Sequence, residues 1–378
     1  MTTIRLIADD LTGALDAAAQ FAAGTPGFPV RLSEGATPSR AMGLNATSCE
    51  SGAISTYSRD LNAAAGKDAI AKAAPFLAGA DIAFVKIDSL LRGNWATDLV
   101  ALLAAYPGRS CIFAPAFPAQ GRVTVGGRQF APGPDGVPFL LPIAPAEKLA
   151  ALGLTTSLVS SGAISLVEPG GVLICDAAEQ ADLDILARTT RAMNRPVLWC
   201  GSAGLARALA GQEPPKIMPD AASPLIVVGS FHPVTLEQID AVPGDLAARV
   251  LLGPDSVAAA KRIERTINVT SCIATIDLPP GLSPSEAIPT IVSRLAATLP
   301  RISSPRLLLV IGGETLAAVC RAVHAEALAI EGEFQPGVPC SRIVGGMWDG
   351  ARLISRSGAF GRPFFLRDIL SGSSRAPA

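Results

Sequence analysis

The fold is decided by the stretch Ile4–Asp16, which reads Ile-Arg-Leu-Ile-Ala-Asp-Asp-Leu-Thr-Gly-Ala-Leu-Asp. A short apolar run ends on two adjacent carboxylates, Asp9 and Asp10, and a Thr-Gly pair leads into an alanine-rich segment. This pattern is typical of a buried parallel strand that is followed by a helix. Ligands bind at the carboxyl ends of the strands in open α/β sheets, so we expect both aspartates to lie in a site.

Helix capping is the alternative role for one of these aspartates, because Asp is a favoured N-cap residue. Thr12 is also placed like a helix cap. Two adjacent carboxylates are harder to explain by capping alone, since their repulsion is normally relieved by a cation, a metal or a polyol ligand. We therefore predict a ligand-binding role for the pair Asp9 and Asp10.

Length and composition restrict the class of protein. A chain of 378 residues is too long for one ordinary core, which predicts two domains. A net charge of −1 argues against a nucleic-acid or anionic-membrane partner. Carboxylates interrupt the N-terminal apolar run, no apolar run approaches membrane-spanning length, and seven scattered cysteines form no C-x-x-C, so we expect a cytoplasmic protein. With two histidines a His-based zinc site is not expected, and we assign no metal ligand with confidence.

Short apolar runs alternate with alanine-rich helical stretches, which predicts an α/β fold of two domains, each a mostly parallel sheet flanked by helices. Strands are expected at Ile4–Ala8, Ile82–Ile87, Ser110–Ala114, Val172–Cys175 and Val197–Cys200, and then at Leu225–Val228, Val250–Leu252, Ile273–Ile276 and Leu307–Ile311. Helices are expected at Ala14–Ala23, Leu61–Leu77, Trp95–Ala105, Glu179–Met193, Ala203–Ala210, Val234–Ala241, Asp255–Ile267, Ser285–Leu299 and Thr315–Ala327.

Two stretches break this rhythm. Gly211–Pro224 carries four prolines and no periodicity, so we place a linker there. The predicted limits are 1–212 for the N-terminal domain, 213–224 for the linker, 225–370 for the C-terminal domain and 371–378 for a tail. Gly126–Pro145 is dense in Gly and Pro, and we predict a long ordered loop near a site, because such loops are uncommon unless functional.

A second strand end carries charged residues within Asp81–Asn94. Lys86 interrupts an apolar strand, and alternation places it on the same side as Asp88. Arg92 offers a planar fork to a carboxylate, while Lys86 offers a point charge to an oxyanion. The alternative is a Lys–Asp pair that decorates the strand end, with Arg92 in solvent.

A constrained loop follows the next predicted strand, within Ala114–Gly127. Gln120, Arg122 and Thr124 are side chains there that can contact hydroxyls or a carboxylate. A structural crossover would explain the loop as well.

Glycine-rich turns mark the C-terminal half. Leu307–Thr315 ends a strand in Gly-Gly-Glu-Thr and opens a helix, a pattern typical of an anion cradle. Further small-residue turns at Gly229-Ser230, Gly345-Gly346 and Ser357–Gly361 favour a nucleotide site, although each could be only a turn. Neither a P-loop motif nor a strand followed by G-x-G-x-x-G is present, which argues against a P-loop enzyme and a standard dinucleotide fold.

With these motifs in place, the chain resembles the four-carbon acid sugar kinase family over nearly its whole length. The matching motifs are Asp9–Ala14, Lys86–Asn94, Ala114–Arg122, Gly229-Ser230 with Pro233–Thr235, Gly312–Thr315, Gly337–Pro339 and Ser357–Gly361. The resemblance implies an N-terminal domain that binds the sugar acid, a C-terminal domain that binds ATP, and an active site in the interdomain cleft.

By resemblance, the sugar acid should face Asp9, Asp10, Lys86, Asp88 and Arg92, with Gln120 and Arg122 as further substrate-binding residues, and ATP should face Ser230, Gly312, Gly313, Glu314, Thr315 and Gly358. Four residues depart from the family pattern. Leu90 and Arg128 fall on the substrate side and suggest a shifted sugar-acid preference. His232 and Arg356 fall on the nucleotide side.

The function that we predict is transfer of the ATP γ-phosphoryl group to a hydroxyl of a small sugar acid such as threonate, erythronate or a 3-oxo-tetronate. Arg92, with Lys86, would hold the substrate carboxylate. One of Asp9 and Asp10 would deprotonate the acceptor hydroxyl, with Asp88 as the competing base. Mg²⁺ would bridge the phosphates, with Glu314 as a contact.

Two alternatives stay open at this point. A sugar-acid dehydrogenase would share the α/β layout, but the missing dinucleotide fingerprint counts against it. A non-catalytic sugar-acid sensor would need no phosphate cradle. A homodimer is expected only from the general frequency of two-fold oligomers.

Overall fold

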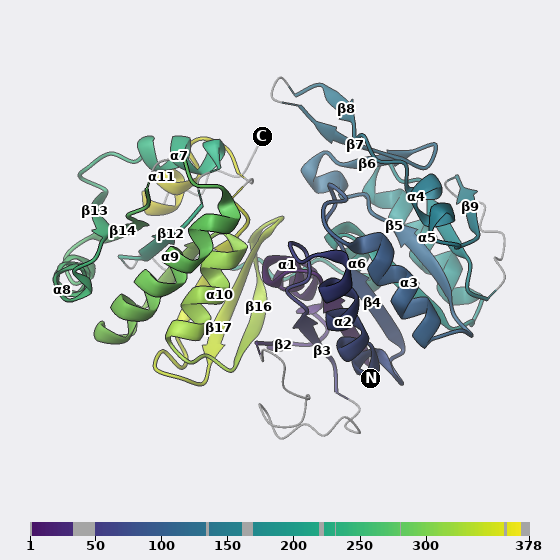
Figure 1. Cartoon of the computed structure of the whole chain (residues 1–378), viewed down its shortest axis with the longest axis horizontal. Coiled ribbons are helices and arrows are strands. Elements are labelled where there is room, and N and C mark those ends of the chain that lie inside the picture. Colours follow the sequence, from purple (N-terminus) through teal and green to yellow (C-terminus); the bar gives the residue numbers. More distant parts are fainter. Residues whose placement is uncertain are drawn as a thin grey trace. The chain divides into compact units, whose positions relative to one another are not determined.

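The computed structural model describes residues 2–32, 50–133, 136–160, 169–218, 223–230, 232–279, 281–358 and 361–371. The chain divides into two compact units (Figure 1). The first unit is Met1–Arg31 with Gly35–Pro215, and the second is Leu32–Glu34 with Lys216–Ala378. The boundary after Pro215 falls inside the predicted linker, whose residues 216 and 217 pair with Glu333. The predicted tail lies outside the described residues apart from Ser371.

The first unit contains a parallel sheet with the strand order β2-β3-β1-β4-β11-β5-β10-β9. Its strands are β1 (Ile4–Ala8), β2 (Phe28–Arg31), β3 (Gly52–Ser55), β4 (Ile82–Lys86), β5 (Ser110–Ala114), β9 (Thr156–Val159), β10 (Val172–Cys175) and β11 (Val197–Gly201). Its helices are α1 (Leu11–Phe21), α2 (Ala63–Ala73), α3 (Trp95–Ala105), α4 (Pro145–Ala151), α5 (Gln180–Ala192) and α6 (Ala203–Ala210), with 3₁₀ turns at Ala74–Leu77 and Pro118–Gln120.

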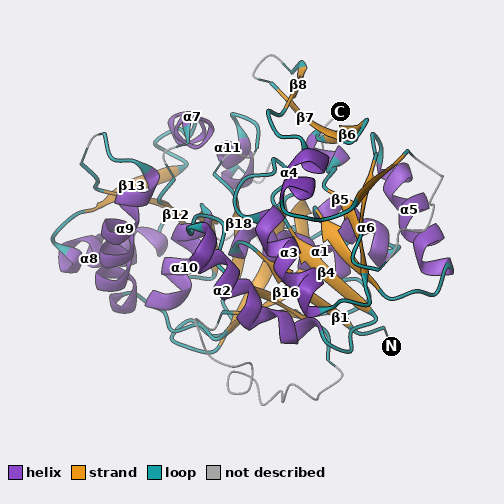
Figure 2. Ribbon diagram, turned by 45° about the vertical axis from the view of Figure 1, so that its right-hand side comes forward, coloured by secondary structure: helices purple, strands orange, loops and turns teal. Residues whose placement is uncertain are grey.

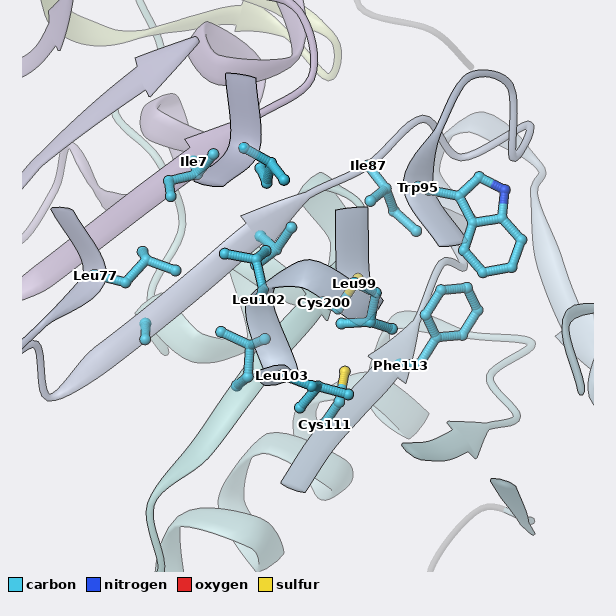
Figure 3. Close-up of a cluster of buried hydrophobic side chains, with 14 of the residues drawn as sticks. Ile7, Leu77, Ile87, Trp95, Leu99, Leu102, Leu103, Cys111, Phe113 and Cys200 are labelled. Atoms are coloured by element: carbon cyan, nitrogen blue, oxygen red, sulfur yellow. The ribbon is translucent and has the colours of Figure 1, made fainter. Parts of the chain in front are cut away.

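The core of the first unit lies between this sheet and the helices α2 and α3. Leu99, Leu102 and Leu103 follow helical spacing on α3 and pack over the sheet residues Phe113 and Cys200 (Figure 3). α2 packs against α3, while α1 and α5 both pack against α6. Helices therefore cover the strands of this unit, as a parallel sheet requires (Figure 2).

The second unit contains a sheet with the order β13-β14-β12-β15-β18-β17-β16, in which β17 alone runs antiparallel to its neighbours. Its strands are β12 (Leu225–Val228), β13 (Ala247–Leu252), β14 (Ser271–Ile276), β15 (Leu307–Ile311), β16 (Ala327–Gln335), β17 (Val338–Val344) and β18 (Arg352–Arg356). Its helices are α7 (Pro233–Asp240), α8 (Ser256–Ile267), α9 (Pro284–Thr298), α10 (Gly313–Ala322) and α11 (Phe365–Leu370), with a 3₁₀ turn at Leu299–Arg301. The predicted α/β class is confirmed.

The prediction of a long ordered loop over Gly126–Pro145 is corrected, because its described residues include two strands. The segment belongs to a small antiparallel sheet of β6 (Val123–Val125), β7 (Arg128–Pro132) and β8 (Pro138–Leu140), which extends from the first unit (Figure 1). Gly126 and Gly127 form the turn between β6 and β7 with φ of 58° and 70°. A two-residue Gly-Gly turn with both φ values positive is a hairpin signal, because its twist matches that of the strands.

Other predicted bounds also need correction. The predicted helix Thr315–Ala327 ends at Ala322, and Ala327 instead opens β16. The predicted helix Leu61–Leu77 is an α-helix only over Ala63–Ala73. The prediction also omitted the strands β2, β3, β9 and β16 to β18. Among the described residues, every helix is too short or too polar to cross a membrane.

Candidate active site

Asp9 and Asp10 stand at the carboxyl end of β1, where α1 begins. Asp10 is the N-cap of α1: its carboxylate accepts hydrogen bonds from the Gly13 amide at 2.8 Å and from the Thr12 hydroxyl at 2.5 Å. Asp9 is only 4 % exposed. Capping therefore accounts for Asp10 in part, while the burial of the Asp9 carboxylate requires a compensating cation.

That cation is Arg59, which the sequence analysis missed. Its guanidinium donates to both oxygens of Asp9, at 2.9 and 2.7 Å, and lies 2.7 Å from each oxygen of Asp10. Burial alone would lower the pKa of Arg59, but the charges of Asp10 and Asp9 raise it above the usual range. Burial raises the pKa of Asp9, and Arg59 offsets this only in part. One arginine thus holds two adjacent carboxylates.

The end of β4 lies beside the end of β1, because Ala8 pairs with Lys86. The Lys86 side chain is buried, and its ammonium group donates to the carbonyl of Ile87 at 2.9 Å. A Cβ atom added to Gly13 would lie 3.2 Å from the Lys86 Nζ. The ammonium group is therefore held beside the first turn of α1, close to the two aspartates.

Asp88 pairs with Arg92 rather than with Lys86. The guanidinium donates to both carboxylate oxygens, at 2.6 and 2.9 Å, and half of the Arg92 side chain remains exposed. Burial acts to raise the pKa of Asp88, but the hydrogen bonds and charge of Arg92 outweigh it and lower the pKa overall. Asp88 is therefore a weak proton acceptor, and Arg92 keeps an exposed edge.

The small antiparallel sheet is fastened to this region by buried polar residues. Arg122 donates to the Ser89 hydroxyl at 2.5 Å, and the Gln129 amide donates to the Ser89 carbonyl at 3.0 Å. Gln129 is fully buried and accepts a hydrogen bond from the Thr124 hydroxyl at 2.7 Å. Burial lowers the pKa of Arg122 to about 10, so the group stays charged at neutral pH. Gln120 lies half-buried in the 3₁₀ turn that precedes Arg122.

In the second unit, three loops meet without room for larger side chains. A Cβ atom on Gly358 would collide with the Ser230 side chain, and one on Gly229 would collide with the Thr315 hydroxyl. Gly312 has a φ of 107°, and its added Cβ would lie 3.1 Å from that hydroxyl. The ends of β12, β15 and β18 therefore form one small-residue cradle at the N-terminus of α10, which suits a phosphate group.

The remaining predicted nucleotide residues flank this cradle. Gly313 and Glu314 begin α10 and are half-buried. His232 is the exposed N-cap of α7 and accepts a hydrogen bond from the Val234 amide. Arg356 is 1 % exposed, donates to Gln238 and lies 4.8 Å from the Phe365 ring. Its guanidinium is thus held by internal partners beneath the cradle.

The first unit also has a cavity of about 510 Å³ away from these residues. Its walls include the starts of β1 and β4, at Ile4 and Ile82, and Arg191 of α5. These positions lie at the opposite end of the strands from Asp9 and Lys86. The cavity therefore does not belong to the carboxylate cluster.

Comparisons with known proteins also distinguish an N-terminal from a C-terminal part of the chain. A family model described as a sugar-binding N-terminal domain matches residues 4–141 and 144–209, and a nucleotide-binding C-terminal domain matches residues 225–366. Solved structures of a Salmonella typhimurium protein (TM-score 0.71, 20 % identity, 99 % of each chain) and a Haemophilus influenzae protein (TM-score 0.67, 18 % identity, 98 % of this chain and 100 % of that one) share the fold. Fold and site define a protein that joins a sugar-binding to a nucleotide-binding domain.

Curated relatives identify the family. A D-threonate kinase of Cupriavidus necator is 33 % identical over 74 % of this chain and 76 % of its own. A D-threonate kinase of Salmonella typhimurium is 28 % identical over 97 % of both chains, and a D-erythronate kinase of Heliobacterium modesticaldum is 24 % identical over 73 % of this chain and 76 % of its own. The chain therefore belongs to the four-carbon acid sugar kinase family and is a sugar-acid kinase that uses ATP. The predictions of family and activity are confirmed.

Proposed function

We propose that this kinase transfers the γ-phosphoryl group of Mg²⁺–ATP to a hydroxyl of a tetronate, with D-threonate as the first candidate. The observation that carries the proposal is the pair Asp9 and Asp10 held by Arg59 at the end of β1. Adjacent carboxylates can accept hydrogen bonds from neighbouring hydroxyls of a polyol. Two relatives of this chain are named D-threonate kinases, which supports D-threonate. A third relative is named a D-erythronate kinase, which makes erythronate the second candidate.

Within this proposal, Asp10 orients and deprotonates the acceptor hydroxyl. Its side chain is 17 % exposed, compared with 3 % for Asp9, so Asp10 presents the more accessible carboxylate. Asp9 fixes Arg59 and binds a neighbouring hydroxyl. Phosphoryl transfer needs mainly positioning and charge neutralisation, so a carboxylate held by four donors is suited to orienting the hydroxyl. The low pKa of Asp88 argues against our earlier alternative of Asp88 as the base.

The carboxylate of the sugar acid would bind Arg92 and Lys86. Arg92 exposes half of its side chain while Asp88 fixes the fork from behind, which leaves an edge for a second carboxylate. Gln120 and Arg122 stay proposed contacts from the neighbouring loop. Because Arg122 already donates to Ser89, we assign it chiefly to the placement of that loop.

The donor nucleotide would bind the cradle of Ser230, Gly312, Gly313, Thr315 and Gly358. Mg²⁺ usually keeps several waters and takes one or two carboxylates besides the phosphates, and the half-buried Glu314 in the first turn of α10 is a carboxylate of this kind. We propose that transfer requires the two units to bring donor and acceptor together and to exclude water, with the active site between the domains.

The test of the substrate is ADP release from Mg²⁺–ATP with D- and L-threonate, D- and L-erythronate and the 3-oxo-tetronates, against a control without acid. We expect turnover with one or two members. ADP, but not NAD, should raise the melting temperature, since only a ligand of the native state stabilises it. If no acid supports turnover and ADP does not raise the melting temperature, the proposal is contradicted and a sensor is favoured. If NAD raises the melting temperature, a dehydrogenase is favoured.

Asp10→Asn tests the role of the acceptor base. Asparagine caps a helix as well as aspartate does, so the melting temperature should stay close to that of the wild type. Loss of the charged oxygen should lower kcat by about 10²- to 10⁴-fold, the usual effect of a general base, while the ADP-induced thermal shift is retained. A variant that keeps near-normal kcat would move the role to Asp9.

Subunit association stays a prediction. We propose a homodimer on the frequency of two-fold homo-oligomers alone. Light scattering after size exclusion would decide between one chain and two.

A further inference from the structure

One buried carboxyl group of the first unit, that of Asp98, takes no part in the mechanism proposed above. Asp98 lies in the first turn of α3 and is 3 % exposed. Its Oδ1 has no hydrogen-bond partner among the described residues, and its Oδ2 lies 3.4 Å from the Ser58 hydroxyl. A buried carboxylate with so few donors is costly, whereas the neutral acid is not.

The Ser58 hydroxyl continues into a chain that ends at the acceptor cluster. It lies 2.8 Å from the Thr56 hydroxyl, which in turn lies 3.0 Å from the carbonyl oxygen of Ala8, the residue before Asp9. The chain has three contacts, and each needs one proton. The two hydroxyls supply two protons. The third contact is satisfied only when Asp98 is protonated and donates to Ser58, so that Ser58 donates to Thr56 and Thr56 donates to Ala8.

The same segment positions Arg59. The backbone amide of Arg59 donates to the Asp9 carbonyl at 3.2 Å, and the carbonyl of the preceding Ser58 accepts from the Asn94 amide at 3.0 Å. Asp98 therefore acts on Ser58 from one side, while Arg59, one residue later, holds Asp9 and Asp10. A shift of Ser58 would therefore displace the backbone of Arg59, which carries the guanidinium of the cluster.

The charge balance favours the neutral acid up to neutral pH. Burial, and then the charge of Asp9, raise the pKa of Asp98 to about 7, against the opposing hydrogen bond of Ser58. Asp9 is the charged group that acts on the pKa of Asp98. The charges of Arg59, Asp10 and Lys86 in turn act on the pKa of Asp9. Above neutral pH, an ionised Asp98 adds negative charge beside a site that must accept an anionic acid.

We propose that Asp98 is a positioning residue of this kinase, whose proton completes the chain through Ser58 and Thr56 and keeps the acceptor site ready for an anionic sugar acid. Ionisation of Asp98 breaks one contact of the chain and repels the substrate carboxylate. The proposal rests on the role proposed above for Asp9, Asp10 and Arg59 in binding the acceptor.

The experiment compares the full-length wild type with Asp98→Asn, Asp98→Ala and the control Asp68→Asn, an exposed acid on α2. kcat and KM are measured for the acid and for ATP from about pH 5.5 to about pH 9. In the wild type, KM for the acid should rise up to tenfold per pH unit above about pH 7. Asp98→Asn, which donates like the neutral acid, should lose this rise and keep its kcat. Asp98→Ala should lower kcat at every pH, and KM for ATP should not change.

Thermal unfolding supplies a readout that does not depend on turnover. Because the native pKa of Asp98 lies above its unfolded value of 3.8, the native state binds the extra proton, and stability falls from about pH 4 to about pH 7 and then levels off. Asp98→Asn should lack this component, and Asp68→Asn should retain it. An alkaline rise in KM and a melting profile that are identical in the wild type and Asp98→Asn would overturn the proposal. If the wild type turns over none of the acids but its melting profile still differs from that of Asp98→Asn, the result would instead contradict the proposed substrate.

Discussion

Replacing Arg59 by alanine is expected to cost about 3–5 kcal/mol of stability, because it leaves the buried Asp9 carboxylate unpaired beside Asp10. Turnover should fall roughly 100-fold or more, since the two carboxylates would no longer be held in one geometry. Arg59→Lys should recover part of the stability but little of the turnover, because a lysine cannot present a fork to two carboxylates. Chemical denaturation and steady-state kinetics measure both effects.

The double variant Arg59→Ala with Asp9→Asn is the control for this interpretation. It removes the unpaired charge together with its partner, so stability should recover by more than the two single changes predict when they are added. Turnover should stay low. If Arg59→Ala alone unfolded at the wild-type denaturant concentration, the pairing of Arg59 with the two aspartates would be unimportant for stability.

Replacing Gly358 by alanine is expected to weaken nucleotide binding with little effect on the acceptor site. The added Cβ would lie 2.8 Å from the Ser230 Cβ, a distance at which one of the two must shift, while its 3.4 Å distance to the Thr235 hydroxyl is an ordinary contact. Overpacking of this kind costs about 1–3 kcal/mol. KM for ATP should rise roughly tenfold or more, which corresponds to about 1.4 kcal/mol, while KM for the sugar acid stays within about twofold.

Two further variants separate the steric effect of the added Cβ from the loss of a contact with the nucleotide. Gly244→Ala is the matched control, because an added Cβ at this position of the same unit meets nothing within 4 Å. It should leave both KM values unchanged. Adding Ser230→Gly to Gly358→Ala removes the colliding side chain and should restore the melting temperature without restoring ADP binding. Full recovery of ADP binding would show that the Ser230 hydroxyl makes no contact with the nucleotide.

The sequence predicts best those features whose signal is local. Strands such as Leu307–Ile311 are apolar, short and followed at once by glycine or carboxylate, so their ends and their chemistry are visible together. The cradle around Gly312 could be predicted because glycine is favoured where φ is positive and neighbouring side chains approach the backbone closely. The charged strand end at Lys86 was visible because a lysine interrupts an otherwise apolar strand.

Contacts between distant segments could not be predicted. Arg59 lies about fifty residues from Asp9 and follows β3, which is short and only partly buried, so nothing local connects the two. Arg356 was assigned to the nucleotide side by its position, but its partners Gln238 and Phe365 come from other elements. The strands β16 and β17 are stabilised by pairing with each other. Their mixed composition gave no clear strand signal, so the predicted helix was extended to Ala327.

The carboxylate cluster belongs to the first unit and the glycine cradle to the second, so under the proposed function each unit carries one half of the chemistry on its own core. The two halves are therefore free to diverge at different rates. We expect substitutions near Lys86 or in the β6–β8 sheet to change the preferred acceptor acid and to leave the phosphate donor unchanged. Under the proposed function, such a division would allow related kinases to act on different acids, in line with the names D-threonate kinase and D-erythronate kinase of two relatives.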